Sequence, residues 1–314
     1  MLIRQFIQSL LGLVFLVSTS SAISNTQFTY SFIDEGIELT GCVDECPSVL
    51  VIPEEIDGYV VVSIGDWAFY VPEEGDAGYD EFAGTFTALT LPNTITYIGR
   101  RAFSGNPISS LTIPNSVREI GVGAFDRCAI ETLVIEDGVL YLREGAFYNN
   151  SLTNVIIPES VIEIGKTVFY RNMLTEITIP KSVTSIGDRA FGRNELVTVN
   201  FNGNRPNIYQ NIENEPNTTF MENQLQSIFF CPGSSGWPGE SIEGITPQLG
   251  GNCPAYSVLD FDQNGSFDAL TDVLILLRYA FGLRGDNLIN GVISPAANRT
   301  TASEIEAHIQ SLLQ

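Results

Sequence analysis

Hydrophobic and polar residues recur along the middle of this chain with a period of 22 residues. Four segments align without gaps between residues 102 and 189, and a fifth begins at Ala190. Phenylalanine forms one column and proline another, in which Glu136 is the exception; the columns are Phe103, Phe125, Phe147, Phe169 and Phe191, and Pro92, Pro114, Pro158 and Pro180. A repeat of this length is typical of a solenoid, in which each repeat forms one coil stacked on the next.

Within each repeat, apolar and polar residues alternate over one short stretch, which is the pattern of a β-strand with one buried face. The inward pairs are Leu111/Ile113, Leu133/Ile135, Val155/Ile157, Ile177/Ile179 and Val199/Phe201. Proline ends each stretch because it cannot donate a hydrogen bond to a ladder. One coil cannot bury its apolar side alone, so the array needs its neighbours. The pattern therefore predicts a mainly β solenoid.

A column of asparagines accompanies the phenylalanines, at Asn106, Asn150, Asn172, Asn194 and Asn223, with Cys128 in the remaining place. Leucine-rich repeats carry Asn or Cys at such a position. An inward side chain there satisfies backbone groups of the turns. Cys128 is therefore predicted to be a buried free thiol.

The first 22 residues have the pattern of a cleaved export signal. Arg4 provides the positive end, residues 10–17 the apolar stretch, and Ala22 the small residue at the cleavage point. The alternative is a membrane anchor, but the apolar run is too short to span a bilayer. No later run is long and apolar enough to span a membrane. We therefore expect a protein that is secreted, extracellular or held on the cell surface.

Composition narrows the function further. Among 314 residues, 15 are Lys or Arg and 37 are Asp or Glu, for a net charge of −22. Nucleic-acid binding depends on clustered cations, so the acidity argues against that class of partner. The single histidine, His308, argues against a Ser-His-Asp triad or a zinc site built on several histidines. We expect no enzyme activity.

Export permits disulfides, and the chain has five cysteines. If Cys128 is free, the other four cysteines can form two disulfides between neighbours in the sequence. Cys42–Cys46 would close a small loop before the repeats, and Cys231–Cys253 would join the last coil to the segment after it. A solenoid needs such a cap at each end.

A loop rich in acids follows the repeats and precedes an apolar helical stretch. Calcium takes oxygen ligands from alternate positions of a short loop with glycine at its sixth position, which is Gly265 here. The predicted ligands are Asp260, Asp262, Asn264, the backbone carbonyl of Ser266, Asp268 and Asp272. The alternative is an Asx-rich turn that holds no metal.

Two helices are expected in this C-terminal region. The first runs from Asp272 to Phe281, and the second begins near Ala302 behind a capping box of Thr301 and Glu304. The predicted domains are therefore a signal peptide (1–22), a solenoid with an N-terminal cap (23–240), a linker (241–258) and a small α-helical calcium-loop module (259–314).

The repeats resemble the BspA-type leucine-rich repeats of bacterial and protist surface proteins. The likeness rests on runs such as Ile113–Val117, Ile120-Gly121 and Ala124-Phe125, and it covers about residues 49–240. It implies a leucine-rich-repeat fold and extracellular interaction, including adhesion to host or matrix proteins in some members. It implies no catalytic residues and identifies no ligand.

The C-terminal region resembles a dockerin, which is a pair of EF-hand-type calcium loops with helices. The matching stretch is Asp260–Gly282. Two features depart from the family. The first loop has one extra residue before its final acid, and the second loop (293–301) lacks acids. The Ser/Thr pair by which many dockerins recognise cohesins is replaced by Ala269-Leu270. A cohesin-like partner is implied by the resemblance and questioned by this replacement.

The outward positions of the predicted strands form the candidate binding face. The residues assigned to this face are Thr90, Thr112, Asn154, Glu176, Thr178, Thr198 and Asn200, and the same outward stripe also contains Val134 and Ile156. The alternative is a solvated sheet face rich in threonine, a residue that favours strands. An acidic insertion within residues 70–88 is a second candidate surface, with a solvated loop as its alternative.

The sequence thus predicts a secreted or cell-surface binding protein, in which a solenoid presents the recognition surface and a calcium-stabilised module attaches it. The alternative function is a non-catalytic subunit of an extracellular polysaccharide-degrading complex, recruited through the dockerin-like module.

Overall fold

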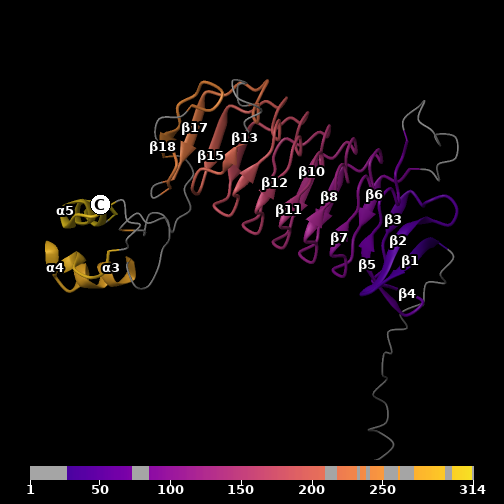
Figure 1. Ribbon diagram of the computed structural model, residues 1–314, viewed down its shortest axis with the longest axis horizontal. Coiled ribbons are helices and arrows are strands. Elements are labelled where there is room, and N and C mark those ends of the chain that lie inside the picture. Colours follow the sequence, from indigo (N-terminus) through magenta and orange to yellow (C-terminus); the bar gives the residue numbers. More distant parts are fainter. Residues whose placement is uncertain are drawn as a thin grey trace, which may run out of the picture.

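The computed structural model describes residues 27–72, 85–208, 218–231, 234–237, 241–250, 261, 272–293 and 299–312. The chain forms a β-solenoid of about eight coils, each about 22 residues long, and three helices follow it (Figure 1). The predicted signal peptide lies outside the described residues.

One side of the solenoid is a continuous sheet. Its first two strands, β1 (Phe28–Ile33) and β2 (Gly36–Cys42), form an antiparallel hairpin, and β4 (Glu55–Ile56) pairs antiparallel with β5. All later neighbours are parallel. From β2 the order is β5 (Tyr59–Ile64), β7 (Tyr97–Ile98), β9 (Glu119–Ile120), β11 (Tyr141–Leu142), β12 (Glu163–Ile164), β14 (Ser185–Ile186) and β16 (Asn207–Ile208).

The other side carries the strands that the alternating pattern predicts, and it is divided into three parallel ladders. The first joins β3 (Val49–Val51) and β6 (Ala88–Thr90), and the second joins β8 (Ser110–Ile113) and β10 (Thr132–Ile135). The third contains β13 (Glu176–Ile179), β15 (Thr198–Phe201), β17 (Ser227–Phe230) and β18 (Gln248–Leu249). Inward residues of these strands are buried and outward residues are mostly exposed.

One coil departs from the predicted pattern. Residues 152–157 contain no strand, so the ladder stops at β10 and begins again at β13. Val155 and Ile157 nevertheless remain inward and buried, as the alternation predicts. Asn154 stands where β10 has a threonine, and asparagine is disfavoured in strands. Side-chain burial and backbone pairing are therefore separate properties of this coil.

The phenylalanine column forms the spine of the core. The rings of Phe103, Phe125 and Phe147 lie stacked with centroids 5.2 and 5.6 Å apart and planes within 9° of each other. The same stacking continues through Phe169 and Phe191 to Phe220. These rings are fully buried or nearly so, so every coil shares its largest apolar contact with the coils on both sides.

The asparagine column connects neighbouring coils through the backbone. Asn172 donates to the carbonyl oxygens of Phe147 and Phe169, at 3.0 and 3.1 Å, and its Oδ1 accepts from the Leu152 N–H at 3.1 Å. Cys128 occupies the same place as a free, fully buried thiol, as predicted. Its Sγ lies 3.2 Å from the Phe103 carbonyl oxygen, and burial raises the pKa of the thiol.

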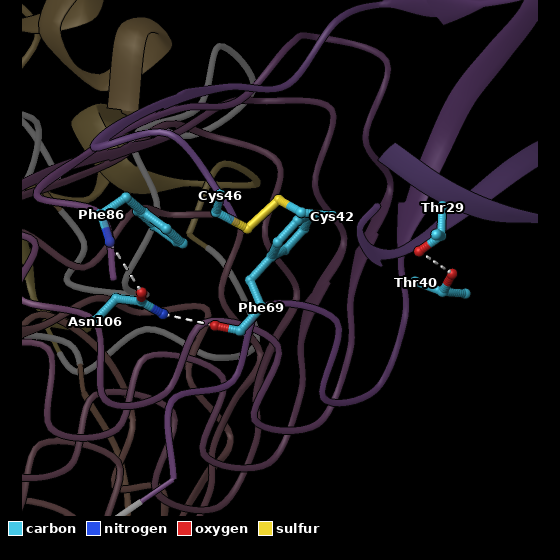
Figure 2. The surroundings of a disulfide bond; sticks show 7 residues. All are labelled: Thr29, Thr40, Cys42, Cys46, Phe69, Phe86 and Asn106. Atoms are coloured by element: carbon cyan, nitrogen blue, oxygen red, sulfur yellow. Dashed lines mark hydrogen bonds between the residues drawn. A yellow bond between two sulfur atoms is a disulfide. The ribbon is translucent and has the colours of Figure 1, made fainter. Parts of the chain in front are cut away.

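A cap covers the N-terminal end of the array. The predicted disulfide Cys42–Cys46 is present (Figure 2), and Phe28 packs edge-on against Phe69. Asn106 ties this end to the first full coil, since its side-chain amide donates to the Phe69 carbonyl at 2.7 Å. At the other end, the buried Trp237 stacks on Phe230. Cys231 is disulfide-bonded, and its predicted partner Cys253 lies outside the described residues.

The helices form a second, small core. They are α3 (Asp272–Ala280), α4 (Asp286–Ile289) and α5 (Ala302–Leu312). Their buried apolar residues are separate from the solenoid core: Phe261, Ile275, Leu288, Val292, Ile305 and Ile309. The capping box is present, since Thr301 and Glu304 exchange hydrogen bonds at the start of α5. The short helix α4 has no counterpart in the sequence prediction. Within the described part of the chain, no helix has the length and apolarity needed to cross a membrane.

Candidate binding surfaces

The predicted binding face is largely open. Thr90, Thr112, Asn154 and Glu176 are exposed, and Thr178 and Thr198 are half-buried. All six lie on the side of the solenoid that carries the interrupted ladders.

Asn200 is a correction to this set. Its side chain is only 3 % exposed, and its Nδ2 donates to Glu176 Oε1 at 2.8 Å. The residue paired with it on the next strand is Phe229, which is larger than the threonines at the equivalent outward positions. Asn200 therefore holds Glu176 in place and offers little surface of its own.

A groove lies where the ladder is interrupted. It has a volume of about 540 Å³, and its floor includes Asn154–Pro158, between the levels of β10 and β13. Ile156 projects from this coil with 76 % of its surface exposed, and Val134 on β10 is 49 % exposed. A large apolar side chain this exposed is unusual on a surface that is otherwise polar. The lining of the groove therefore includes an exposed apolar anchor, Ile156.

The rim of this groove is acidic. Asp137, Glu159 and Glu176 line it, and none of its lining residues, all of which are described, is basic. Residues 154–157 pair with neither neighbouring strand. We call this feature the acidic groove. Its chemistry favours a ligand that offers both apolar and positively charged groups.

Ile156 and Val134 belong to the outward stripe predicted from the sequence but were not among the residues assigned to the binding face. Both stand at outward positions of the 22-residue pattern, where most repeats carry a small or polar residue. A β-branched apolar residue at a position that should face water is the signal that identifies them.

Five of the six predicted calcium ligands, Asp260, Asp262, Asn264, Ser266 and Asp268, lie outside the described residues. The sixth, Asp272, is fully buried at the first residue of α3, and its Oδ1 accepts a hydrogen bond from the Phe261 N–H at 2.6 Å. This hydrogen bond joins Asp272 to the residue that follows the first predicted ligand, Asp260. The described residues include no group of three or more acids, cysteines or histidines placed to hold a metal.

The chain was compared with known proteins, and several solved structures of leucine-rich-repeat proteins are similar to it. No curated protein matches the chain. A leucine-rich-repeat protein from Bacteroides ovatus is 19% identical over 65% of this chain and 70% of that chain, with a TM-score of 0.32. A leucine-rich-repeat protein from T. pallidum is 24% identical over 65% of this chain and 83% of that chain, with a TM-score of 0.38. A leucine-rich cell surface protein from Faecalibacterium prausnitzii is 15% identical over 77% of this chain and 97% of that chain, with a TM-score of 0.30.

The profile of the BspA type leucine-rich-repeat region, in six copies, matches residues 78–198 and 144–236. Together these stretches cover half of the chain. They contain the phenylalanine and asparagine columns that form the core. The chain therefore belongs to the BspA type leucine-rich-repeat family.

Proposed function

We propose that this protein is a secreted or cell-surface binding protein that holds an extracellular protein in the acidic groove. The observation that carries the proposal is Ile156, an exposed apolar side chain that lines the groove together with three acidic residues. Protein interfaces concentrate their binding energy in such apolar anchors, surrounded by polar residues that exclude water. The export signal expected in residues 1–22 supports an extracellular location.

Charge indicates the kind of partner. The chain carries −22, and the groove repeats that sign locally with Asp137, Glu159 and Glu176. A field of one sign steers a partner of the opposite sign and raises its rate of association. The partner should therefore present a segment in which Lys or Arg flanks a large apolar residue.

A peptide library displayed on phage tests this function with the full-length protein as bait. We expect the selected peptides to combine Leu, Ile or Phe with Lys or Arg, and their binding to weaken as salt screens the rim. Ile156→Asp should abolish capture. Thr112→Asp is the matched control, because it adds the same charge to the same face at an exposed position outside the groove. Peptides that bind both variants equally well would place the binding surface elsewhere.

We further propose that the C-terminal region is an attachment module stabilised by calcium. Asp260, Asp262, Asn264, Ser266, Asp268 and Asp272 would hold the ion, which would neutralise carboxylates that otherwise repel each other. The hydrogen bond between Phe261 and Asp272 supports this assignment. Calcium titration of the full chain, with Asp268→Ala as the variant, tests it. If calcium changes the circular dichroism signal of the helices equally in the wild type and in Asp268→Ala, the proposed calcium site is wrong.

A further inference from the structure

A second depression lies on another part of the solenoid, along the turns that contain the buried phenylalanines. We call this region the turn edge. The depression has a volume of about 490 Å³, within the range of small-molecule sites. Three of the chain's 15 basic residues, Arg101, Arg127 and Arg171, line it together with Asp126, Glu144 and Tyr148. Cations therefore gather here, although the protein as a whole is strongly acidic.

An aromatic column ends at this depression. Tyr148 and Tyr170 occupy the position after the phenylalanine in successive coils, and their rings stack with centroids 5.6 Å apart and planes 11° apart. In the preceding coil the same position holds Asp126, whose side chain is much shorter. Tyr148 lines the depression and Tyr170 does not. The stack of tyrosine rings therefore ends at the depression, beside Asp126.

Two of the arginines are available to an anion. Within the described part of the chain, neither Arg101 nor Arg171 has a carboxylate oxygen within the 4.0 Å of an ion pair. The Arg101 guanidinium lies over the Trp67 ring, 5.3 Å from its centre, and Arg171 lies 6.0 Å from the centre of Tyr170. Stacking on a ring leaves the in-plane N–H groups of a guanidinium free to donate to a carboxylate.

The backbone is strained at these positions. Arg101, Arg127 and Arg171 have φ angles of 49°, 56° and 58°. This left-handed region disfavours residues that carry a Cβ atom. In the neighbouring coils, glycine stands at the place equivalent to Arg127 (Gly105) and at the place equivalent to Arg101 (Gly123), whereas Asn149 and Arg193, also with positive φ, stand at the places equivalent to Arg171. Positive φ recurs at these two places of the turn along the solenoid, so the backbone at Arg171 can accept glycine.

The depression also holds a hydrogen-bond acceptor. Asp126 is 7 % exposed, and its Oδ1 is buried without a hydrogen-bond partner. Its Oδ2 lies 3.3 Å from Arg127 Nε, which keeps the carboxylate beside the cations. Buried acceptors are nearly always satisfied, so a donor from a ligand is expected here.

We propose that the turn edge binds a sugar that bears a carboxylate, of the kind found as uronic or sialic acid units in extracellular glycans. The sugar ring stacks on Tyr148, its carboxylate receives hydrogen bonds from Arg101 and Arg171, and a hydroxyl donates to Asp126. This site is independent of the acidic groove and takes a ligand of opposite charge.

Titration calorimetry of the full chain with four probes tests the site. They are methyl glucuronide, the methyl glycoside of N-acetylneuraminic acid, methyl glucoside and inorganic sulfate. We expect one or both acidic sugars to bind at least about tenfold more tightly than the other two probes. Whichever acidic sugar binds more tightly shows whether the natural ligand carries a uronic acid or a sialic acid unit. Equal affinity for methyl glucoside, equal affinity for sulfate, or no binding of either acidic sugar would each overturn the proposal.

Variants separate binding from folding. Arg171→Gly should lower the affinity for the acidic sugar by at least about tenfold. The melting temperature should stay the same or rise, because glycine relieves the backbone strain. Arg193→Gln is the matched control, since Arg193 holds the same column in the next coil, pairs with Glu222 and lies outside the depression. The proposal is wrong if both variants keep full affinity, or if Arg171→Gly unfolds the chain while Arg171→Gln binds normally.

Discussion

The solenoid and the C-terminal helices obtain their order in different ways. In the solenoid, each coil repeats the contacts of the one before it, so a single apolar cluster continues from Phe28 to Ile242. The helical region has a separate core built on six buried residues. A small core supplies little stabilisation, and small domains commonly add a metal or a disulfide. This difference shows that contacts repeated from coil to coil can stabilise a long, thin fold, whereas a small isolated core needs an additional stabilising element such as a metal or a disulfide.

The largest effect should come from breaking the phenylalanine stack. Phe147→Ala removes a fully buried ring that packs on Phe125 and Phe169, and we expect a loss of about 3–5 kcal/mol in the free energy of unfolding. Chemical denaturation followed by circular dichroism measures it. Thr112→Ala on the exposed face is the control and should change stability by less than about 0.5 kcal/mol. Similar losses for the two variants would show that the inward and outward positions are wrongly assigned.

Removal of calcium should destabilise the helical region and leave the solenoid unchanged. If calcium binds as proposed, a concentration 100 times its Kd stabilises the helical region by about 2.7 kcal/mol, and a chelator abolishes this. Hydrogen exchange of the full chain should then show faster exchange in α3 and α5. Amides of β8 and β15 serve as the internal control and should be unaffected. Unchanged exchange in the helices would mean that the acidic loop is a turn without a metal.

The asparagine column offers a smaller perturbation within the solenoid. Asn172→Ala leaves the Phe147 and Phe169 carbonyls and the Leu152 N–H without their side-chain partner, and we expect a total loss of about 1–3 kcal/mol in the free energy of unfolding. Thermal unfolding measures the loss. Asn154→Ala, at an exposed position, should be nearly neutral. An equally small change for Asn172→Ala would show that the column contributes little to the joining of coils.

The smallest effect concerns pH. Burial raises the pKa of Asp126 from an ordinary value of 3.8 to about 6. The folded state therefore holds this proton more tightly than the unfolded state, so its contribution to stability is complete below pH 3.8 and is lost as pH rises through about 6. Asp126→Asn cannot lose a proton, so its melting temperature should rise relative to that of the wild type across this range. A constant difference between the two proteins would show that Asp126 has a normal pKa.

Much of the fold could be predicted because repetition reveals which positions face inward. The residues Phe103 to Phe191, Asn172 and Cys128 all occupy the places that their columns indicate, and the local hairpin disulfide Cys42–Cys46 is also present. The binding face was predicted only in outline. Asn200 belongs to the outward pattern yet is buried, because its pairing with Phe229 and its bond to Glu176 depend on the neighbouring coils.

The sequence by itself determined the period, the inward columns and the acidity, because each is a property of residue type at a fixed spacing. Only the tertiary structure decided where the ladder stops at residues 152–157, and only it brought Arg101 and Arg171 to one depression beside Tyr148. The physical reason is that the pattern within one coil indicates which side chains point inward and which point outward. Hydrogen-bond registry and the shape of a groove depend on how successive coils stack, which no single repeat specifies.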